Sequence, residues 1–506
     1  MLRRTLRTGP RRLAALAGGA SLTALALPAA AGAADGPTLT DVASGVDTTW
    51  VMVAAILVMF MQAGFLLLEI GFSRMKNAGA GVAKVLMNFS IASIAYWAVG
   101  FALAFGGAGT IAGNHGFFLN VGHSAAEAAD KIPLLGTYNI APAALFFFQF
   151  VFCAVSLAIV WGTTLERIKW QAYALYAVIF GAVIYPLVSH WIFGGGWLQA
   201  NTGMQDFAGS TVVHLIGATG ALAALLLLGP RRGKYGPDGK PRAIPGHSMP
   251  LVGLSVFILW FGWFGFNPGS GLGAIGGRFA EVAVVTNLAA AAGVIFASLT
   301  IYTIQKKIDI GMAGNGAIAA LVAITAPSGY VEYWAAPIIG AVAGVLVVVC
   351  VLAIEKVLDD PVGALSAHGV AGIWGTLSCG IFTSPRLADL NAVGDPDLVY
   401  SGSFHQLGAQ ALGVVCAFAF VFVISYACFF LIKKTVGLRV TAVEEEAGLD
   451  IAEHGMYGYP EQFIPAPEIG AGSTGPVADR ARGGVPAPAT AMTANGAATS
   501  TAGVTS

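Results

Sequence analysis

The sequence predicts an all-α polytopic membrane protein with eleven transmembrane helices, arranged as an inverted 5+5 repeat plus one extra helix. Three observations predict this class: 56% of the 506 residues are hydrophobic and only 10% are charged, long apolar runs recur along the chain, and one polar motif occurs twice. A soluble protein carries roughly a quarter charged residues, so the composition excludes a water-soluble globule. Lys+Arg and Asp+Glu number 26 each, and this zero net charge gives no overall field that would attract nucleic acid.

Residues 1–33 have the plan of a signal peptide. Five arginines in the first twelve residues precede an Ala/Leu-rich run that ends in an A-x-A cleavage pattern. An uncleaved first helix is the alternative. We divide the rest into a membrane domain (34–435), a cytoplasmic regulatory segment (436–465) and a tail (466–506), whose Pro, Gly, Ala, Ser and Thr content predicts disorder.

About 20 consecutive apolar residues cross a bilayer as a helix. Eleven stretches meet this length, and each is predicted to be a transmembrane span. They are residues 47–70, 82–106, 139–164, 170–192, 209–229, 250–267, 280–304, 311–327, 333–355, 363–383 and 405–432.

The distribution of basic residues predicts the orientation of these spans. Sixteen lysines and arginines lie in or beside the loops after odd-numbered spans, including Lys84 and Lys356, and only three lie in the opposite loops. Cytoplasmic loops carry the excess of Lys and Arg. We therefore expect a plasma-membrane protein with its N-terminus outside and its C-terminus in the cytoplasm.

The repeated motif is D-x-x-G-x-x-x-x-H, which runs from Asp206 to His214 and again from Asp360 to His368. Each copy begins a predicted span, the fifth and the tenth, and the two histidines are 154 residues apart. An odd number of spans separates the copies, so the second is inverted relative to the first. Inverted repeats are typical of transporters whose site lies near the midplane.

The two aspartates are predicted to be N-caps that accept hydrogen bonds from backbone N–H groups. Capping does not exclude a second role for Asp206, whose span begins on the outer side. Because Asp360 begins its helix on the inner side, only Asp206 is placed to favour a cation that arrives from outside.

Each histidine follows its aspartate by eight residues, which is about 12 Å along a helix. This distance places His214 and His368 well inside the bilayer, where an ionisable residue indicates function. We expect both rings to be largely neutral, able to donate and accept one hydrogen bond each. A histidine that only bonds to a neighbouring helix is the alternative.

We expect no metal site and no cofactor. No Cys, Asp or Glu joins the two histidines at ligand spacing. The five cysteines lie in apolar runs without a CxxC pair, so we expect them to pack rather than to form disulfides.

Two aromatic clusters lie on spans that could line a pore. Residues 146–152 open the third span, and residues 260–270 close the sixth span at its outer end. Aromatic residues at membrane interfaces are often anchors. Here three glycines and a polar end accompany them, and ring faces attract cations, which predicts a cation site at the outer mouth.

These residues resemble the ammonium transporter family (Amt, of the Amt/Rh superfamily), over roughly residues 47–462. The segments that carry the resemblance are Gln62-Ala-Gly-Phe-Leu-Leu-Leu-Glu69-Ile-Gly71, the motif that ends at His214, Gly262-Trp-Phe-Gly-Phe-Asn267, Ala367-His368-Gly369 and the tail segment 444–455.

The resemblance implies a homotrimer in which each protomer has its own pore. It assigns an outer ammonium site to Phe148 and Ser270, with Asp206 behind it and Phe193 where the family usually has Trp. The implied roles of the remaining residues are a pore gate (Phe152, Phe266), pore histidines (His214, His368) and further pore-side positions (Trp263, Thr325). Trp191 and Trp197 flank Phe193 and could substitute for it.

The mechanism predicted from these features begins with capture of NH4+ outside. A bare cation in hydrocarbon costs tens of kcal/mol, so a buried ammonium tends to shed its proton. NH3 then passes the gate and the histidine pair, and the proton travels separately. Methylammonium is the natural analogue. The resemblance further implies that segment 436–462 couples to PII-type signal proteins, although its composition also fits a solvated helix.

Three other functions compete with this one. An ammonium sensor with little flux usually carries a fused kinase or cyclase domain, which we do not find after residue 432. A Rh-like channel for uncharged NH3 or CO2 fits less well with the outer aromatic and serine residues. A membrane enzyme would need a nucleophile–base pair, an HExxH motif or a phosphate loop, and the sequence has none.

Overall fold

The computed structural model describes residues 36–463, apart from residues 108 and 397. The predicted signal peptide (1–33) and the tail (466–506) lie outside the described residues. The chain divides into two compact units, residues 1–43 and 44–506, and the site lies in the second. Within the described residues all regular structure is helical, with three isolated β-bridges and no strand.

Ten helical stretches of the described residues are long and apolar enough to span a membrane, and an eleventh apolar helix is shorter. They confirm the predicted fold class. The spans are α1 (Leu39–Phe72); α2 (Ala78–Ala95) with η2 (Tyr96–Gly100) and α3 (Phe101–Phe105); α6 (Pro142–Thr163); α7 (Trp170–Ile179) with η4 (Phe180–Ile184) and α8 (Tyr185–Ile192); η5 (Ser210–Leu215) with α10 (Ile216–Leu228); α11 (Met249–Gly269); α12 (Arg278–Gln305); α13 (Ile310–Thr325), the shorter one; α14 (Ala335–Ile354); η7 (Leu365–Val370) with α15 (Ala371–Phe382); and α18 (His405–Thr435).

Short helices lie between the spans or follow the last span. They are η1 (Met75–Asn77), η3 (Phe117–Leu119), α4 (Ala125–Ala128), α5 (Leu134–Thr137), α9 (Trp197–Thr202), η6 (Pro327–Gly329), α16 (Pro385–Asn391), α17 (Leu398–Ser401), α19 (Ala442–Ala447), α20 (Leu449–His454) and α21 (Pro460–Phe463).

The first two spans differ most from the predicted ranges. Helix α1 begins at Leu39 instead of residue 47. An apolar run marks only the part of a helix that crosses hydrocarbon, whereas the backbone hydrogen bonds of α1 extend beyond that part. The assignment of Lys84 to the loop cations was wrong: it lies inside α2, and only 2% of it is exposed. Its carboxylate partner Glu453, which is 9% exposed, makes this buried position tolerable.

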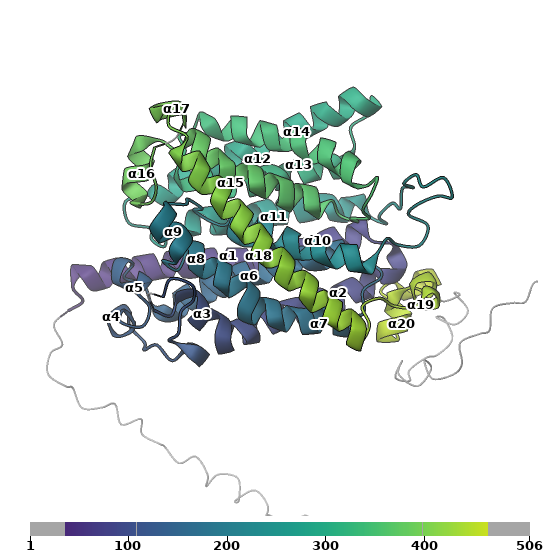
Figure 1. The fold of residues 1–506 in the computed structure, drawn as a ribbon, viewed down its shortest axis with the longest axis horizontal. Coiled ribbons are helices and arrows are strands. Elements are labelled where there is room, and N and C mark those ends of the chain that lie inside the picture. Colours follow the sequence, from purple (N-terminus) through teal and green to yellow (C-terminus); the bar gives the residue numbers. More distant parts are fainter. Residues whose placement is uncertain (1–35, 108, 397, 464–506) are drawn as a thin grey trace, which may run out of the picture. The chain divides into compact units, whose positions relative to one another are not determined.

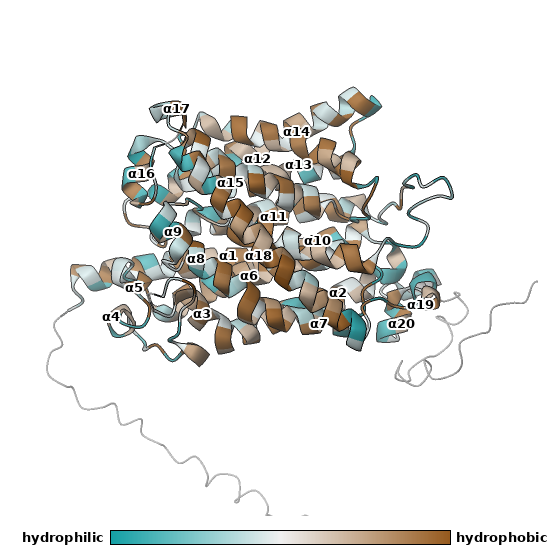
Figure 2. Cartoon of the chain, viewed as in Figure 1, coloured by the Kyte–Doolittle hydropathy of each residue, from teal (hydrophilic) through white to brown (hydrophobic). Residues whose placement is uncertain are grey.

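The helix bundle has two polar ends, which we call the tail face and the vestibule face. The tail face carries α19 and α20, and the vestibule face carries α9 and α16 (Figure 1). Hydrophilic residues gather at both ends, and hydrophobic residues predominate on the helices between them (Figure 2). In Figure 1, α18 runs diagonally across the other helices, and it packs on α10 and α15.

The fifth and tenth spans start at opposite faces, as the inverted repeat requires. Asp206 precedes η5 at the vestibule face and accepts hydrogen bonds from four backbone N–H groups. Asp360 precedes η7 at the tail face and accepts three. Gly209 and Gly363 both have positive φ, 119° and 73°, a conformation that strongly favours glycine. The repeated D-x-x-G is therefore a helix-start motif. Both aspartates accept the predicted hydrogen bonds from backbone N–H groups, but the N-cap positions themselves are Gly209 and Ala364.

Candidate functional site

A pair of buried histidines joins the two halves of the repeat. His214 lies in η5 and His368 in η7, and both segments are π-helical turns. Their Nδ1 atoms are 3.2 Å apart, and the rings stack with centroids 5.2 Å apart. The backbone segments that carry the two rings lie in close contact. A Cβ atom added at Gly372 in α15 would be 2.7 Å from the Ser210 carbonyl oxygen in η5. The pair that the motif predicted is therefore formed by direct packing of η5 on α15.

The contact between the two Nδ1 atoms requires one to donate and the other to accept a hydrogen bond. Only one of the two atoms therefore carries a proton in the neutral pair. His214 Nε2 is buried and has no hydrogen-bond partner among the described residues. The pair thus keeps an unused ring nitrogen for a small guest.

Aromatic rings fix the position of His214. The Trp263 ring stacks on it with centroids 5.3 Å apart, and the Phe266 ring lies 5.5 Å away. Trp263 Nε1 donates a 2.9 Å hydrogen bond to Thr325 Oγ1. Thr325 therefore orients the Trp263 ring through this hydrogen bond, and the Trp263 ring in turn packs on His214.

The two gate phenylalanines lie face to face. The rings of Phe152 (α6) and Phe266 (α11) stack with centroids 4.0 Å apart, and Phe148 contacts Phe152 from the side at 4.6 Å. Since Phe266 contacts both Phe152 and His214, the aromatic pair lies directly against the histidine pair.

A cavity of about 110 Å³ lies on the other side of the aromatic pair. Its lining includes Phe148, Phe152, Phe193, Asp206 and Ser270, so it brings together all four residues predicted for the outer site and one of the gate.

The structure decides between the aromatic residues of the neighbouring loop. Phe193 lines the cavity. Trp191 instead donates a hydrogen bond from Nε1 to the Ile111 carbonyl, and its ring packs at a tilt against Trp197 and Phe420. Phe193 is therefore the aromatic side chain that this loop presents to the cavity.

Asp206 supports the cavity wall without offering a free oxygen. Its two carboxylate oxygens accept four N–H groups at 2.7–3.1 Å. Burial raises its pKa to about 6, although these four hydrogen bonds act in the opposite direction. Its charge can act on a cation in the cavity only at a distance.

Sequence reasoning missed Gln149. This residue lines the cavity next to Phe148, is 6% exposed, and its carbonyl oxygen has no partner among the described residues. It is the one polar side chain of the aromatic run 146–152, which is the signal that could have identified it.

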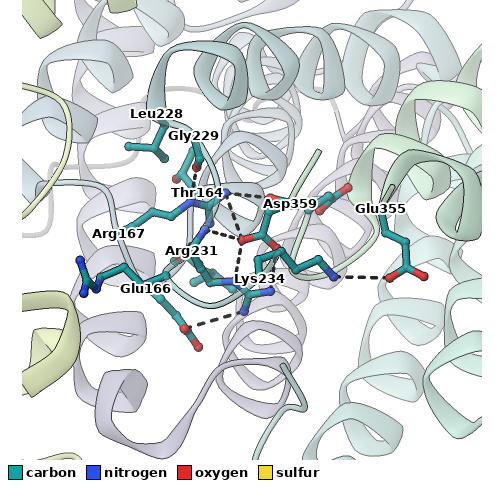
Figure 3. A network of polar contacts seen from close by, with 12 residues as sticks. Thr164, Glu166, Arg167, Leu228, Gly229, Arg231, Lys234, Glu355 and Asp359 are labelled. Atoms are coloured by element: carbon teal, nitrogen blue, oxygen red, sulfur yellow. Dashed lines mark hydrogen bonds and ion pairs between the residues drawn. The ribbon is translucent and has the colours of Figure 1, made fainter. Parts of the chain in front are cut away.

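At the tail face, a buried charge cluster fixes the start of the tenth span (Figure 3). Asp359 accepts three hydrogen bonds from Arg231, from its backbone N–H, Nε and Nη2. Arg167 Nη2 donates to the Asp359 carbonyl oxygen, and Glu166 pairs with Arg74. Burial alone would raise the pKa of Asp359, but Arg231 and Arg167 lower it to about 2. Sequence reasoning missed this cluster.

The segment after α18 packs on the same face. Asp450 Oδ1 accepts the Ala80 N–H at 2.8 Å, and Glu453 Oε1 accepts the Trp170 N–H at 2.9 Å. Glu453 Oε2 also pairs with Lys84 Nζ at 3.0 Å. Carboxylates at the N-terminal ends of α2 and α7 are favourable positions for negative charge. The segment is therefore docked rather than solvated on all sides.

The described part of the chain contains no group of three or more His, Cys, Asp or Glu side chains that could hold a metal ion. A cavity adjoins an aromatic pair, and this pair packs against imidazoles from two spans that start at opposite faces. This arrangement defines a polytopic α-helical membrane transport protein.

Comparisons with known proteins give the family. The profile of the Ammonium Transporter Family matches residues 49–459. "Ammonium transporter Amt2" of Archaeoglobus fulgidus is 44% identical over 438 residues, which cover 84% of this chain and 90% of the relative. "Ammonium transporter 3" of Dictyostelium discoideum is 35% identical, with 82% and 94% covered.

Solved structures agree. "Sensor Amt Protein" has a TM-score of 0.74 and 37% identity, with 82% of this chain and 99% of that chain covered. Mep2 of Candida albicans has a TM-score of 0.72 and 28% identity, with 82% and 90% covered. The chain belongs to the ammonium transporter family. It is a multi-pass membrane protein that transports ammonium, and it is not an enzyme.

Proposed function

We propose that the protein captures NH4+ in the vestibule cavity, removes one proton and conducts NH3 past the aromatic pair and the histidine pair to the tail face. The observation that carries this proposal is the unbroken order of contacts from the cavity through Phe152 and Phe266 to His214 and His368.

Capture depends on the cavity wall. Phe148 and Phe193 offer ring faces to a cation, and Ser270 and Gln149 bring polar atoms to the same wall. Ser270 Oγ donates to the Phe266 carbonyl, which leaves its oxygen lone pairs to accept an N–H of ammonium. The buried charge of Asp206 favours a cation from behind.

Deprotonation follows from the aromatic pair. A bare cation between two stacked rings loses its hydration, and desolvation favours the uncharged form of an amine. Buried lysines indicate how large this effect is: the pKa of their ammonium group falls from about 10.4 to about 5–6. The fall corresponds to roughly 7 kcal/mol in favour of the uncharged amine. No strong base is needed at this point, because the proton passes to the ring nitrogen of His214, whose ring lies 5.5 Å from that of Phe266.

The histidine pair then carries NH3 by hydrogen bonding. NH3 both donates and accepts, and the unused ring nitrogen of His214 matches either role. The released proton moves along the same pair by exchange between the two Nδ1 atoms. Transport is electrogenic in this proposal.

The surroundings of the protein are part of the proposal. The vestibule face lies outside, and the tail face lies in the cytoplasm of a bacterium, because the basic loops follow the positive-inside pattern. Residues 1–33 act as a signal peptide. The protomers form a homotrimer in the lipid bilayer, each with its own pore.

Regulation is assigned to the tail face. The docked segment 436–463 offers a surface to a PII-type signal protein, and its carboxylates contact the ends of two spans. Pull-down with the cell's PII protein at varied ADP, ATP and 2-oxoglutarate tests this partner. Absence of binding in all of these conditions would refute it.

The second candidate function is an ammonium sensor with little flux, which the structural similarity to "Sensor Amt Protein" brings forward. Ammonium-evoked currents of proteoliposomes on a supported membrane separate the candidates. A transporter that moves NH3 and a proton gives a saturable current. A sensor gives neither current nor methylammonium uptake, and a channel for neutral gas gives uptake without current.

A further inference from the structure

One buried acid has no part in the transport steps proposed for the cavity and the rings. Glu69 lies on α1 with 1% of its surface exposed, and neither of its carboxylate oxygens completes a hydrogen bond with any described residue. A buried polar group without a partner is costly and usually indicates an ordered water or a function. Glu69 is also one of the residues that carry the family resemblance, yet capture, deprotonation and conduction leave it without a role.

Glu69 lies on the tail side of the histidine pair. The ring of Phe65, one helical turn earlier on α1, has its centroid 6.5 Å from that of His368, and four residues advance a helix by about 6 Å. Helix α1 runs on from there to its end at Phe72, beside the charge cluster that Arg74 joins. The carboxylate is therefore about one turn beyond the rings.

The carboxylate occupies a space between α6 and the start of the tenth span. A Cβ atom added at Gly162 would lie 3.3 Å from Glu69 Oε1 and 3.4 Å from Val362 Cγ2. Any side chain at position 162 would fill the space between the acid and Val362. Glycine here leaves room at the carboxylate.

Two further buried polar atoms have no partner among the described residues. They are Ser366 Oγ, which is two residues before His368, and the indole nitrogen of Trp161, which is one residue before Gly162. The Trp161 indole and the Lys84 ammonium group interact electrostatically with the Glu69 carboxylate, although the indole completes no hydrogen bond with it. Each unused donor or acceptor is a place where a water molecule can bind.

Charged groups continue from Glu69 to the tail face. The ammonium group of Lys84 lies 4.4 Å from the ring centroid of Trp161 and 3.0 Å from Glu453 Oε2. Asp450 also acts on Lys84 from α20. Glu453 is 9% exposed, so this series of groups ends at the surface.

We propose that Glu69 is the proton acceptor on the tail side of the histidine pair. The proton released by NH4+ leaves the pair, passes through water to the Glu69 carboxylate, and is released to water at the tail face. The acid then returns to its carboxylate form, and NH3 and one proton have crossed. This inference rests on the electrogenic transport of the proposed function.

The test compares three variants in proteoliposomes that contain an internal pH dye. Glu69→Gln keeps the shape but cannot take up the proton, and Glu69→Asp keeps a shortened carboxylate. Glu355→Gln is the matched control, because Glu355 pairs with Lys234 at the same face, away from the rings. Ammonium-evoked current, methylammonium uptake and internal pH are measured for each.

We expect Glu69→Gln to lose at least tenfold in maximal current, with the half-saturation concentration unchanged because the capture site is intact. NH3 still crosses without its proton, so the interior turns alkaline. Glu69→Asp restores part of the current, and Glu355→Gln behaves as the wild type.

Two results would overturn the inference. One is a Glu69→Gln current equal to that of the wild type. The other is a parallel loss of current and uptake in both Glu69 variants, which indicates a structural role. If Glu69→Gln does not fold, Glu69→Asp alone decides, through a reduced current with uptake retained. A wild type without current would instead refute the proposed electrogenic transport, and this inference with it.

Discussion

The Nδ1 atoms of His214 and His368 lie 3.2 Å apart, although their spans start at opposite faces. One hydrogen bond between two identical atoms leaves a single proton to be shared. A second proton at this contact would place N–H against N–H, so an arriving proton must displace the first. The pair is therefore suited to passing protons one at a time while its outer nitrogen contacts a neutral guest.

The orientation of Trp263 depends on Thr325. Thr325→Val removes the oxygen that accepts its N–H and leaves a buried donor unpaired, which costs about 1–3 kcal/mol. We expect a lower melting temperature in detergent and roughly a fivefold slower uptake, if about 1 kcal/mol of ring positioning is lost. Thr219→Val is the control, because Thr219 donates only to its own helix at Leu215. Equal behaviour of the two variants would contradict this role.

Gln149 is expected to contribute to capture. Gln149→Leu removes a neutral hydrogen bond of about 1 kcal/mol, so the half-saturation concentration for ammonium should rise about fivefold with the maximal rate unchanged. Gln149→Glu should lower it, because it adds a negative charge to the wall. Uptake kinetics of both variants check this, and the same half-saturation concentration in both would show that Gln149 does not touch the cation.

The charge of Asp206 predicts a pH dependence of capture. Its pKa is about 6, so the group is ionised above this pH and neutral below it. The half-saturation concentration for ammonium should therefore rise as the external pH falls from 7 to 5, through the pKa that burial has raised. Asp206→Asn keeps a capping oxygen but not the charge, and it should show a high value without this pH dependence. Identical pH profiles would exclude the role.

The cluster at Asp359 predicts a loss of stability in acid. Its pKa is lowered from 3.8 to about 2, so its contribution is present above pH 4 and disappears as the pH falls towards 2. The difference corresponds to about 2.4 kcal/mol. Melting temperatures measured between pH 5 and 2 should fall more steeply for the wild type than for Asp359→Asn.

Asp359→Asn should itself be less stable by about 3–5 kcal/mol at neutral pH, because Arg167 remains buried without its counter-charge and Arg231 keeps only Glu166, at 3.8 Å. Asp238→Asn is the matched control, since Asp238 and its partner Lys240 are both largely exposed. If both variants melt at the same temperature, the cluster does not stabilise the fold.

Hydropathy predicted the spans because burial in lipid constrains composition directly, and the eight-residue spacing predicted the histidine pair. The same information could not show that both rings lie in π-helical turns, since no residue pattern marks the extra residue in the turn. Lys84 was assigned to a loop because its partner Glu453 lies 369 residues away. The Asp359 cluster was missed for the same reason, because its partners come from distant segments. Gln149 carries a local signal as the one polar residue of the aromatic run, but the sequence does not show that it lines a cavity.

The most direct test of the account is methylammonium uptake by proteoliposomes that contain the double variant His214→Leu/His368→Leu. The Leu side chains fill the position of the rings but offer no hydrogen bond, so we expect uptake to fall to the level of empty liposomes. His405→Leu, which changes an exposed histidine at the start of α18, should transport as the wild type does. Full uptake by the double variant would contradict the central claim that the paired imidazoles carry the substrate.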